Sequence, residues 1–224
     1  GALYLPVFLF FLNFAILTYF PALGFPLTEP RNYFFANLLY MTVNFAVMLL
    51  IFRRTLWQSL REFEGKMLLS VLIGFGMCYG ANLVLTTAYT VLDIMPENYN
   101  QEAVNSLLGG YPLAMTLCTV VLAPLAEECL FRGVLFAPLA RRCLPAAYAL
   151  SMFLFAGMHV FQFLGSMTAA NTILCLSLYL PASFSLCWVY QKTGNIWACI
   201  FLHMFINFQS VLASLLRSLM QAFL

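Results

Sequence analysis

Long, continuous apolar runs constrain the fold of this chain more than any other feature. Seven runs, each of about 20 residues, are long enough to cross a hydrocarbon core of roughly 30 Å. They cover residues 2–20, 32–52, 67–91, 111–137, 146–165, 170–190 and 196–216. None shows the polar–apolar alternation of a transmembrane strand. Only 8% of the 224 residues are charged, against about 25% in soluble domains. We therefore expect an all-α fold, a polytopic transmembrane bundle of about seven helices, with residues 1–224 forming a single membrane domain.

The distribution of Lys and Arg predicts the orientation of this bundle. Three loops that share one side in a seven-helix arrangement hold Arg53, Arg54, Arg61 and Lys66, then Arg141 and Arg142, and then Lys192. The positive-inside rule makes that side cytoplasmic, and with seven helices the N-terminus is cytoplasmic too. The compact size and short loops favour an integral, multi-pass protein of a bacterial plasma membrane. The net charge of +2 is explained by these loops, so we expect no nucleic-acid partner.

A few strongly polar side chains interrupt the apolar runs. They are Glu127, Glu128, Arg132, His159, His203 and Asn207, and the two histidines are the only ones in the chain. A charged residue at the centre of a bilayer costs roughly 2.5–3.5 kcal/mol on insertion scales. An ionisable residue inside a membrane is therefore a candidate for a functional site.

Helical spacing sorts these residues into faces. Glu128 and Arg132 are four residues apart, so they share a face and can form an ion pair that stabilises the structure. Glu127 is rotated by about 100° from Glu128 and needs a different partner. His203 and Asn207 share one face of the last span, and His159 lies four residues after a phenylalanine in "FAGMH". Glu127 can be satisfied if these polar faces converge in one cavity, which we expect to be reached from the cytoplasmic side.

A carboxylate, two imidazoles and a carboxamide in a dry bundle are suited to hydrolysis. Glu127 can act as a general base on water and share the proton with an imidazole. The second imidazole and the amide can donate hydrogen bonds to a developing oxyanion. The alternative is a polar helix-packing network without chemistry. Other intramembrane routes do not fit, since Asp93 is the only aspartate and neither HExxH nor GxSxG occurs.

Three short motifs in this order resemble one membrane protease family. "EECLFR" matches EExxxR, "FAGMH" matches FxxxH and "HMFIN" matches HxxxN. The chain resembles the CAAX protease and bacteriocin-processing (CPBP, or Abi) family, which includes the type II CAAX prenyl endopeptidases. The resemblance covers about residues 111–216, the expected catalytic core.

The resemblance implies a glutamate-dependent intramembrane endopeptidase. Glu127 and His159 would activate water, His203 and Asn207 would bind the substrate carbonyl, and Glu128 with Arg132 would hold the helix. The family is often labelled metalloendopeptidase, and a zinc ion would take Glu127, His159 and His203 as ligands. Glu128 would then have to be the base although it is paired with Arg132, so we expect no cofactor while zinc stays open.

The implied partners are the lipid bilayer and a peptide or protein substrate. The substrate could be a prenylated, CAAX-like tail or a leader-bearing bacteriocin or signal peptide. Two hypotheses from other classes stay open. One is a non-catalytic membrane immunity or scaffold protein. The other is a proton-coupled transporter that uses Glu127 and the histidines as a relay, although such a transporter predicts inverted repeats and we find none.

Overall fold

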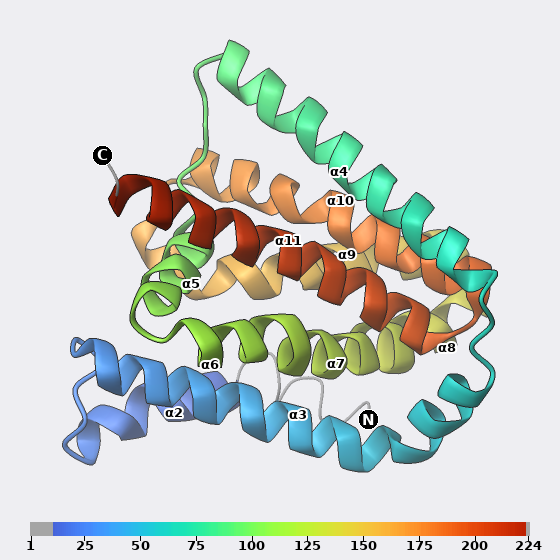
Figure 1. Cartoon of the computed structure of the whole chain (residues 1–224), viewed down its shortest axis with the longest axis horizontal. Helices are drawn as coiled ribbons and strands as arrows, with labels where there is room; N and C mark the ends of the chain where they lie inside the picture. The colour runs from blue at the N-terminus through green and yellow to red at the C-terminus, as the bar shows by residue number, and fades with distance from the viewer. Residues whose placement is uncertain (1–10, 223–224) are drawn as a thin grey trace.

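The computed structural model describes residues 11–222, and the regular secondary structure of this part is entirely helical (Figure 1). The first helices are α2 (Leu12–Ala22), α3 (Pro30–Arg61), α4 (Met67–Val91) and the short α5 (Tyr99–Gly110). One continuous span follows, composed of α6 (Pro112–Leu117), η2 (Cys118–Leu122), α7 (Ala123–Glu128), η3 (Cys129–Phe136) and α8 (Ala137–Ala140). The chain then forms α9 (Leu144–Val160), η4 (Phe161–Ser166), α10 (Ala169–Thr193) and α11 (Ile196–Ala222).

Six of these helical segments are long and apolar enough to cross a membrane. They are Pro30–Arg61, Met67–Val91, Pro112–Ala140, Leu144–Ser166, Ala169–Thr193 and Ile196–Gln221. Each coincides with one of the expected spans, which confirms the all-α, multi-pass fold. The remaining expected span, 2–20, falls about half on residues 2–10, which lie outside the described residues. Its described part belongs to α2, an apolar helix of 11 residues.

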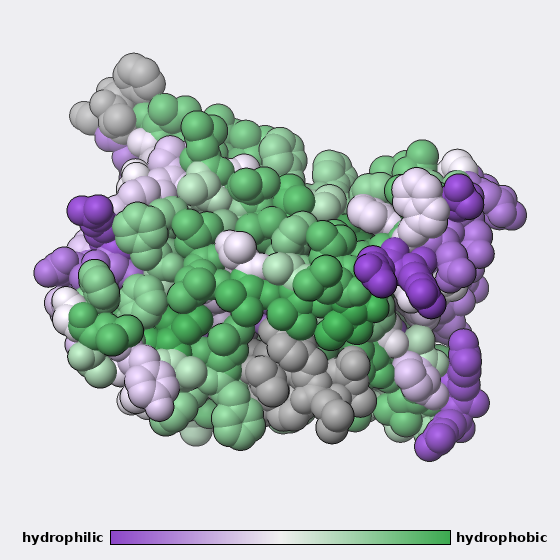
Figure 2. Space-filling view, turned by 90° about the horizontal axis from the view of Figure 1, so that it is seen from below, coloured by the Kyte–Doolittle hydropathy of each residue, from purple (hydrophilic) through white to green (hydrophobic). Residues whose placement is uncertain are grey.

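The long helices run side by side, and α4 leans away from the others at one end (Figure 1). Where α4 packs on α10 and α11, the contact is close. A Cβ on Gly74 of α4 would lie 2.6 Å from the side chain of Val189 and 2.9 Å from that of Leu202. Small residues allow this close approach between helices in a membrane. Figure 2 shows apolar residues over the middle of the visible face and hydrophilic residues gathered at its two ends, as expected for a lipid-facing belt.

The two ends of the bundle differ in charge. The end where α3 stops, α8 meets α9 and α10 stops carries the basic residues Arg53, Arg54, Arg61, Lys66, Arg141, Arg142 and Lys192. Helix α5 lies at the opposite end, between the last residues of α4 and the first residues of α6 (Figure 1). This α5 end carries the acidic residues Glu29, Asp93, Glu97 and Glu102. The asymmetry predicted from the sequence is therefore an asymmetry between the two ends of one bundle.

Candidate active site

Two widened π-helical segments position the paired glutamates. Segment η2 ends just before Ala123–Pro124, and segment η3 follows Glu128 and ends just before Ala137–Pro138. Proline has no N–H, and its ring crowds the carbonyl four residues earlier in an α-helix. The chain relieves this by i→i+5 bonding, in which Ala123 N–H reaches the Cys118 carbonyl and Ala137 N–H reaches the Arg132 carbonyl. Such π segments occur often at functional sites.

The first π segment explains the contact that Asn207 makes. The residue five positions after Thr119 is Pro124, which has no N–H to donate to the Thr119 carbonyl. The Asn207 side chain donates from Nδ2 to this carbonyl oxygen at 2.8 Å. Asn207 of α11 therefore supplies a hydrogen bond that the proline cannot, and this joins α11 to the helix that bears the glutamates.

Glu128 and Arg132 form the expected i,i+4 contact, and both side chains are 0% exposed. Arg132 Nη1 donates to Glu128 Oε1 at 3.2 Å. Arg132 Nη2 donates to the carbonyl and the hydroxyl of Ser183 on α10, at 3.1 and 3.3 Å. The guanidinium also lies 5.1 Å from the centre of the Phe155 ring, within cation–π range. The buried pair thus attaches the central span to α9 and α10.

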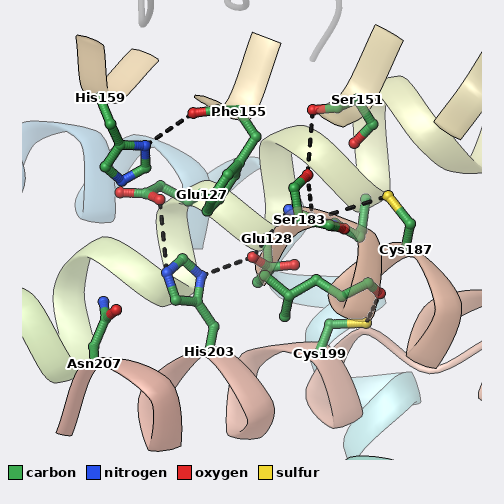
Figure 3. A network of polar contacts seen from close by, with 12 residues as sticks. Glu127, Glu128, Ser151, Phe155, His159, Ser183, Cys187, Cys199, His203 and Asn207 are labelled. Atoms are coloured by element: carbon green, nitrogen blue, oxygen red, sulfur yellow. Dashed lines mark hydrogen bonds and ion pairs between the residues drawn. The ribbon is translucent and has the colours of Figure 1, made fainter. Parts of the chain in front are cut away.

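His203 lies between the two glutamates (Figure 3). Its Nδ1 is 2.8 Å from Glu128 Oε1, and its Nε2 is 3.9 Å from Glu127 Oε2. An ionised carboxylate only accepts hydrogen bonds, so His203 Nδ1 carries a proton and donates it to Glu128. The other ring nitrogen faces Glu127. The spacing arguments gave Glu128 the partner Arg132 alone, because they could not place α11 beside it.

His159 lies on the other side of Glu127. Its Nδ1 is 2.8 Å from the carbonyl oxygen of Phe155, one turn earlier in α9. A carbonyl only accepts, so Nδ1 carries the proton and Nε2 of the neutral ring is an acceptor. Figure 3 shows the Glu127 carboxylate between the two imidazole rings, with the second nitrogen of His159 on its side. Glu127 Oε2 is buried and has no hydrogen-bond partner among the residues described.

A cavity of about 760 Å³ opens beside these groups. Glu127, His159 and Asn207 line it, together with Thr119 and Tyr179, whereas His203 is not among its lining residues and reaches it through Glu127. We predicted one cavity lined by all four residues. The structure has a cavity that is lined by three of them. Its remaining polar lining comes from amide and hydroxyl side chains, those of Asn13, Tyr33, Asn37, Tyr40, Asn100, Gln101, Gln162 and Ser210.

The location of this cavity corrects one expectation. Its lining residues come from α5 and from the parts of the long helices nearer to α5, and no residue of the basic loops lines it. We expected the site to be reached from the side of the basic loops. The lining instead indicates access from the α5 end.

The residues considered for zinc do not form a ligand set. Within residues 11–222, no group of three or more His, Cys, Asp and Glu side chains is arranged to hold a metal ion. The Nδ1 atoms of His159 and His203 are used by the Phe155 carbonyl and by Glu128, which leaves Nε2 of each ring available, as in metal-bound histidines. It is therefore the placement of Glu127, His159 and His203, and not the use of their ring nitrogens, that falls short of a zinc site among the described residues.

Sequence reasoning missed several parts of the site. Tyr179 stacks on His159, with ring centres 4.5 Å apart and an interplanar angle of 20°. Asn98 and Asn100, at the start of α5, bond to its hydroxyl. A single tyrosine in an apolar helix gives no signal of such a role. The proline of "CTVVLAP" could have indicated the π segment, because proline interrupts regular α-helical bonding.

Comparison with known proteins agrees with the motifs. Residues 109–209 match the family described as Type II CAAX prenyl endopeptidase Rce1-like. The Bacillus subtilis (strain 168) protein named "Putative membrane peptidase YdiL" is 28% identical to the chain over 166 residues. That alignment covers 72% of this chain and 64% of the relative, so the chain spans less than two thirds of its length. No solved structure is detectably similar. The matched residues 109–209 carry the glutamate pair, both histidines and Asn207, so the two comparisons support a membrane protease of the CAAX protease (CPBP) family.

Proposed function

We propose that this protein is a glutamate-dependent intramembrane endopeptidase in which Glu127 activates the water that attacks a peptide bond. The observation that carries the proposal is the placement of Glu127. Its carboxylate lies between two imidazoles at the wall of a cavity, and one of its oxygens is buried without a hydrogen-bond partner. A carboxylate in this setting has the geometry of a general base.

In the proposed reaction, a water lies between Glu127 and the unprotonated Nε2 of His159. Glu127 takes one proton as the water oxygen attacks the carbonyl carbon of the scissile bond. The proton then passes to the leaving nitrogen as the C–N bond breaks, which leaves a new carboxyl group and a new amine. His159 orients the water, since its Nδ1 proton is held by the Phe155 carbonyl.

His203 and Asn207 would act on the carbonyl oxygen of the substrate. His203 does not line the cavity and its Nε2 faces Glu127, so in the proposal a substrate that binds beside Glu127 brings its carbonyl oxygen within reach of Nε2–H of the protonated ring. Asn207 lines the cavity and uses one Nδ2 hydrogen for the Thr119 carbonyl, which leaves the second for the substrate. Glu128 and Arg132 keep His203 and the central span in place.

The proposed substrate is a peptide or protein tail that enters from the α5 end. The cavity volume falls within the range of roughly 300–1,000 Å³ that is typical of ligand sites. The amide and hydroxyl groups of its wall can bond to the backbone of an extended peptide, and its apolar wall can take an acyl or prenyl chain. A CAAX-like prenylated tail and a leader-bearing peptide are both compatible with this lining.

The test uses the full chain in liposomes and three probes: a proteome-derived peptide mixture, a farnesylated CAAX peptide and its unprenylated counterpart. Mass spectrometry reads the new N-termini. Glu127→Gln is the test variant. Glu64→Gln is the matched control, because Glu64 is exposed and pairs with Lys66 at the basic end. We expect the wild type and Glu64→Gln to cleave at least one probe and Glu127→Gln to cleave none. Equal cleavage by Glu127→Gln, or no cleavage of any probe by the wild type, would contradict the proposal.

A further inference from the structure

We infer that Tyr179 is a positioning residue for His159, because its ring stacks on the imidazole and its hydroxyl ties that ring pair to the start of α5. The rings of Tyr179 and His159 lie 4.5 Å apart at 20°, and both residues line the cavity. Only the activity readout of this inference rests on the proposed function. The contact itself is independent of it.

The imidazole of His159 needs such a neighbour. Among residues 11–222 its hydrogen bond is that from Nδ1 to the Phe155 carbonyl, and a single bond at one ring nitrogen allows the ring to tilt about that point. The direction of Nε2 decides whether a nitrogen or a C–H faces Glu127. A flat aromatic surface against the ring restricts this tilt and adds attraction of its own.

Tyr179 is itself held at its far end. Its hydroxyl donates to Asn98 Oδ1 at 3.0 Å and accepts from Asn100 Nδ2 at 3.2 Å. Asn98 is the N-cap residue of α5 and accepts from the Gln101 backbone N–H at 3.1 Å through the same oxygen. The tyrosine ring therefore cannot swing away from His159 without breaking two hydrogen bonds at the start of α5.

The start of α5 is in turn fixed to α10, the helix that carries Tyr179. The Glu97 backbone N–H donates to Asn171 Oδ1 at 2.9 Å, and Asn171 Nδ2 donates to the Glu97 carbonyl at 3.0 Å. Two points of α10, Asn171 and Tyr179, thus hold the chain just before and at the beginning of α5. The segment 97–100 is therefore attached to α10 at two points, and its hydrogen bonds to the Tyr179 hydroxyl fix the orientation of the tyrosine ring.

Tyr89 provides a matched control, because it contacts α10 close to Tyr179. Tyr89 of α4 is buried and shares a hydrogen bond with Ser177, two residues before Tyr179 on α10. Tyr89 does not line the cavity. Tyr89→Phe therefore removes the hydroxyl that bonds to Ser177 of α10 and leaves the surroundings of His159 unchanged.

Because His159 and His203 are the only histidines, ¹⁵N-histidine labelling gives a spectrum with two imidazoles, which His159→Gln assigns. We expect Tyr179→Leu to shift the His159 signals and leave those of His203 in place. Tyr179→Phe, which keeps the ring but loses the hydroxyl, should broaden the His159 signals with a smaller shift. Tyr89→Phe should change neither. Unmoved His159 signals in both Tyr179 variants would overturn the inference, and Tyr179→Phe decides alone if Tyr179→Leu does not fold.

Kinetics on a quenched fluorescent peptide built around a cleavage site of the wild type provide the second readout. Misplacing a catalytic group by about 1 Å can cost up to about 100-fold in rate. We expect Tyr179→Leu to lower kcat by about 10-fold or more with KM nearly unchanged, and Tyr179→Phe to recover most of that loss. A loss in Tyr179→Leu confined to KM would contradict positioning. If the wild type cleaves nothing, the proposed function fails, while the imidazole spectra still decide the role of Tyr179.

Discussion

At the scale of single residues, the two adjacent glutamates lie in different surroundings. The Glu128 side chain is 0% exposed and contacts Arg132 and His203, both of which can donate to it. The Glu127 side chain is 12% exposed and lies at the cavity wall, and within residues 11–222 its one ionic partner is His203. The rotation of about 100° between successive helical residues produces this division. These surroundings agree with the proposal that Glu128 is a structural residue and Glu127 the catalytic one.

This division predicts opposite phenotypes for two isosteric substitutions. Glu127→Gln should abolish peptide cleavage and change the midpoint of thermal unfolding little, because no strong partner is lost. Glu128→Gln should leave Arg132 as a buried charge without its counter-ion, at a cost of about 3–5 kcal/mol in stability. Thermal unfolding in detergent and cleavage assays measure the two effects. A destabilised Glu127→Gln beside a stable, inactive Glu128→Gln would reverse the assignment.

Asn207 has a structural contact and a proposed catalytic one, and Asn207→Ala separates them. Losing the bond to the Thr119 carbonyl should cost about 1–3 kcal/mol in stability, because that oxygen is left unsatisfied. Losing an oxyanion donor should lower kcat by a factor of about 10²–10³. The measurement is kcat at a temperature where the variant is fully folded. If kcat stays near that of the wild type there, Asn207 acts only as a packing residue.

At the scale of elements, the span Pro112–Ala140 is the one whose geometry the site depends on. Its π segments precede Pro124 and Pro138 and set the direction in which Glu127 and Glu128 point. Pro124→Ala restores a backbone N–H and permits regular α-helical bonding, which would rotate one part of the span against the other by about 100°.

We therefore expect Pro124→Ala to lower cleavage by more than about 10-fold while the protein stays folded. Pro181→Ala is the control, because Pro181 is buried inside α10, where the helix is α-helical throughout. Cleavage rate and the thermal midpoint are measured for both variants. Full activity in Pro124→Ala would show that the π segment does not set the direction of Glu127.

Much of this element scale could be predicted from the sequence, because it depends on local properties. Run length predicted six spans, with most ends within about three residues, although α3 extends well beyond the expected end at residue 52, to Arg61. The i,i+4 spacing placed Glu128 against Arg132. The contacts that depend on which helices are neighbours could not be predicted. His203 beside Glu128 requires knowing how α11 crosses the central span, and the Tyr179 stack requires knowing how α10 meets the end of α9. A π segment is defined by its i→i+5 backbone hydrogen bonds, and these cannot be predicted from the pattern of hydrophobic residues.

At the scale of the whole molecule, the cavity and the basic residues lie at opposite ends. The positive-inside rule places the basic end in the cytoplasm. On this rule we predict that the α5 end, and with it the entrance to the site, faces the other side of the membrane. The sequence-based expectation joined a cytoplasmic basic end to a cytoplasmic site, whereas the structure places the cavity towards the α5 end. Which end faces the cytoplasm stays a prediction.

A native cysteine allows this topology to be measured. Cys143 is the one exposed cysteine of the seven, and it directly follows Arg141 and Arg142 at the basic end. Glu102→Cys adds an exposed thiol at the α5 end. We expect an impermeant maleimide to label Glu102→Cys in intact cells and to label Cys143 only after the membrane is opened. Labelling of Cys143 in intact cells, with Glu102→Cys protected, would invert the orientation.

In the proposed reaction, Glu127 delivers a water directly to the peptide bond. A single-turnover cleavage in H₂¹⁸O tests this, by protein that has been exhaustively treated with chelator and checked by elemental analysis. We expect cleavage to persist and the new carboxyl group to contain ¹⁸O from the first turnover. Loss of cleavage that added zinc restores would show that a metal activates the water, and a first-turnover product without ¹⁸O would show that a side chain, rather than water, attacks the bond.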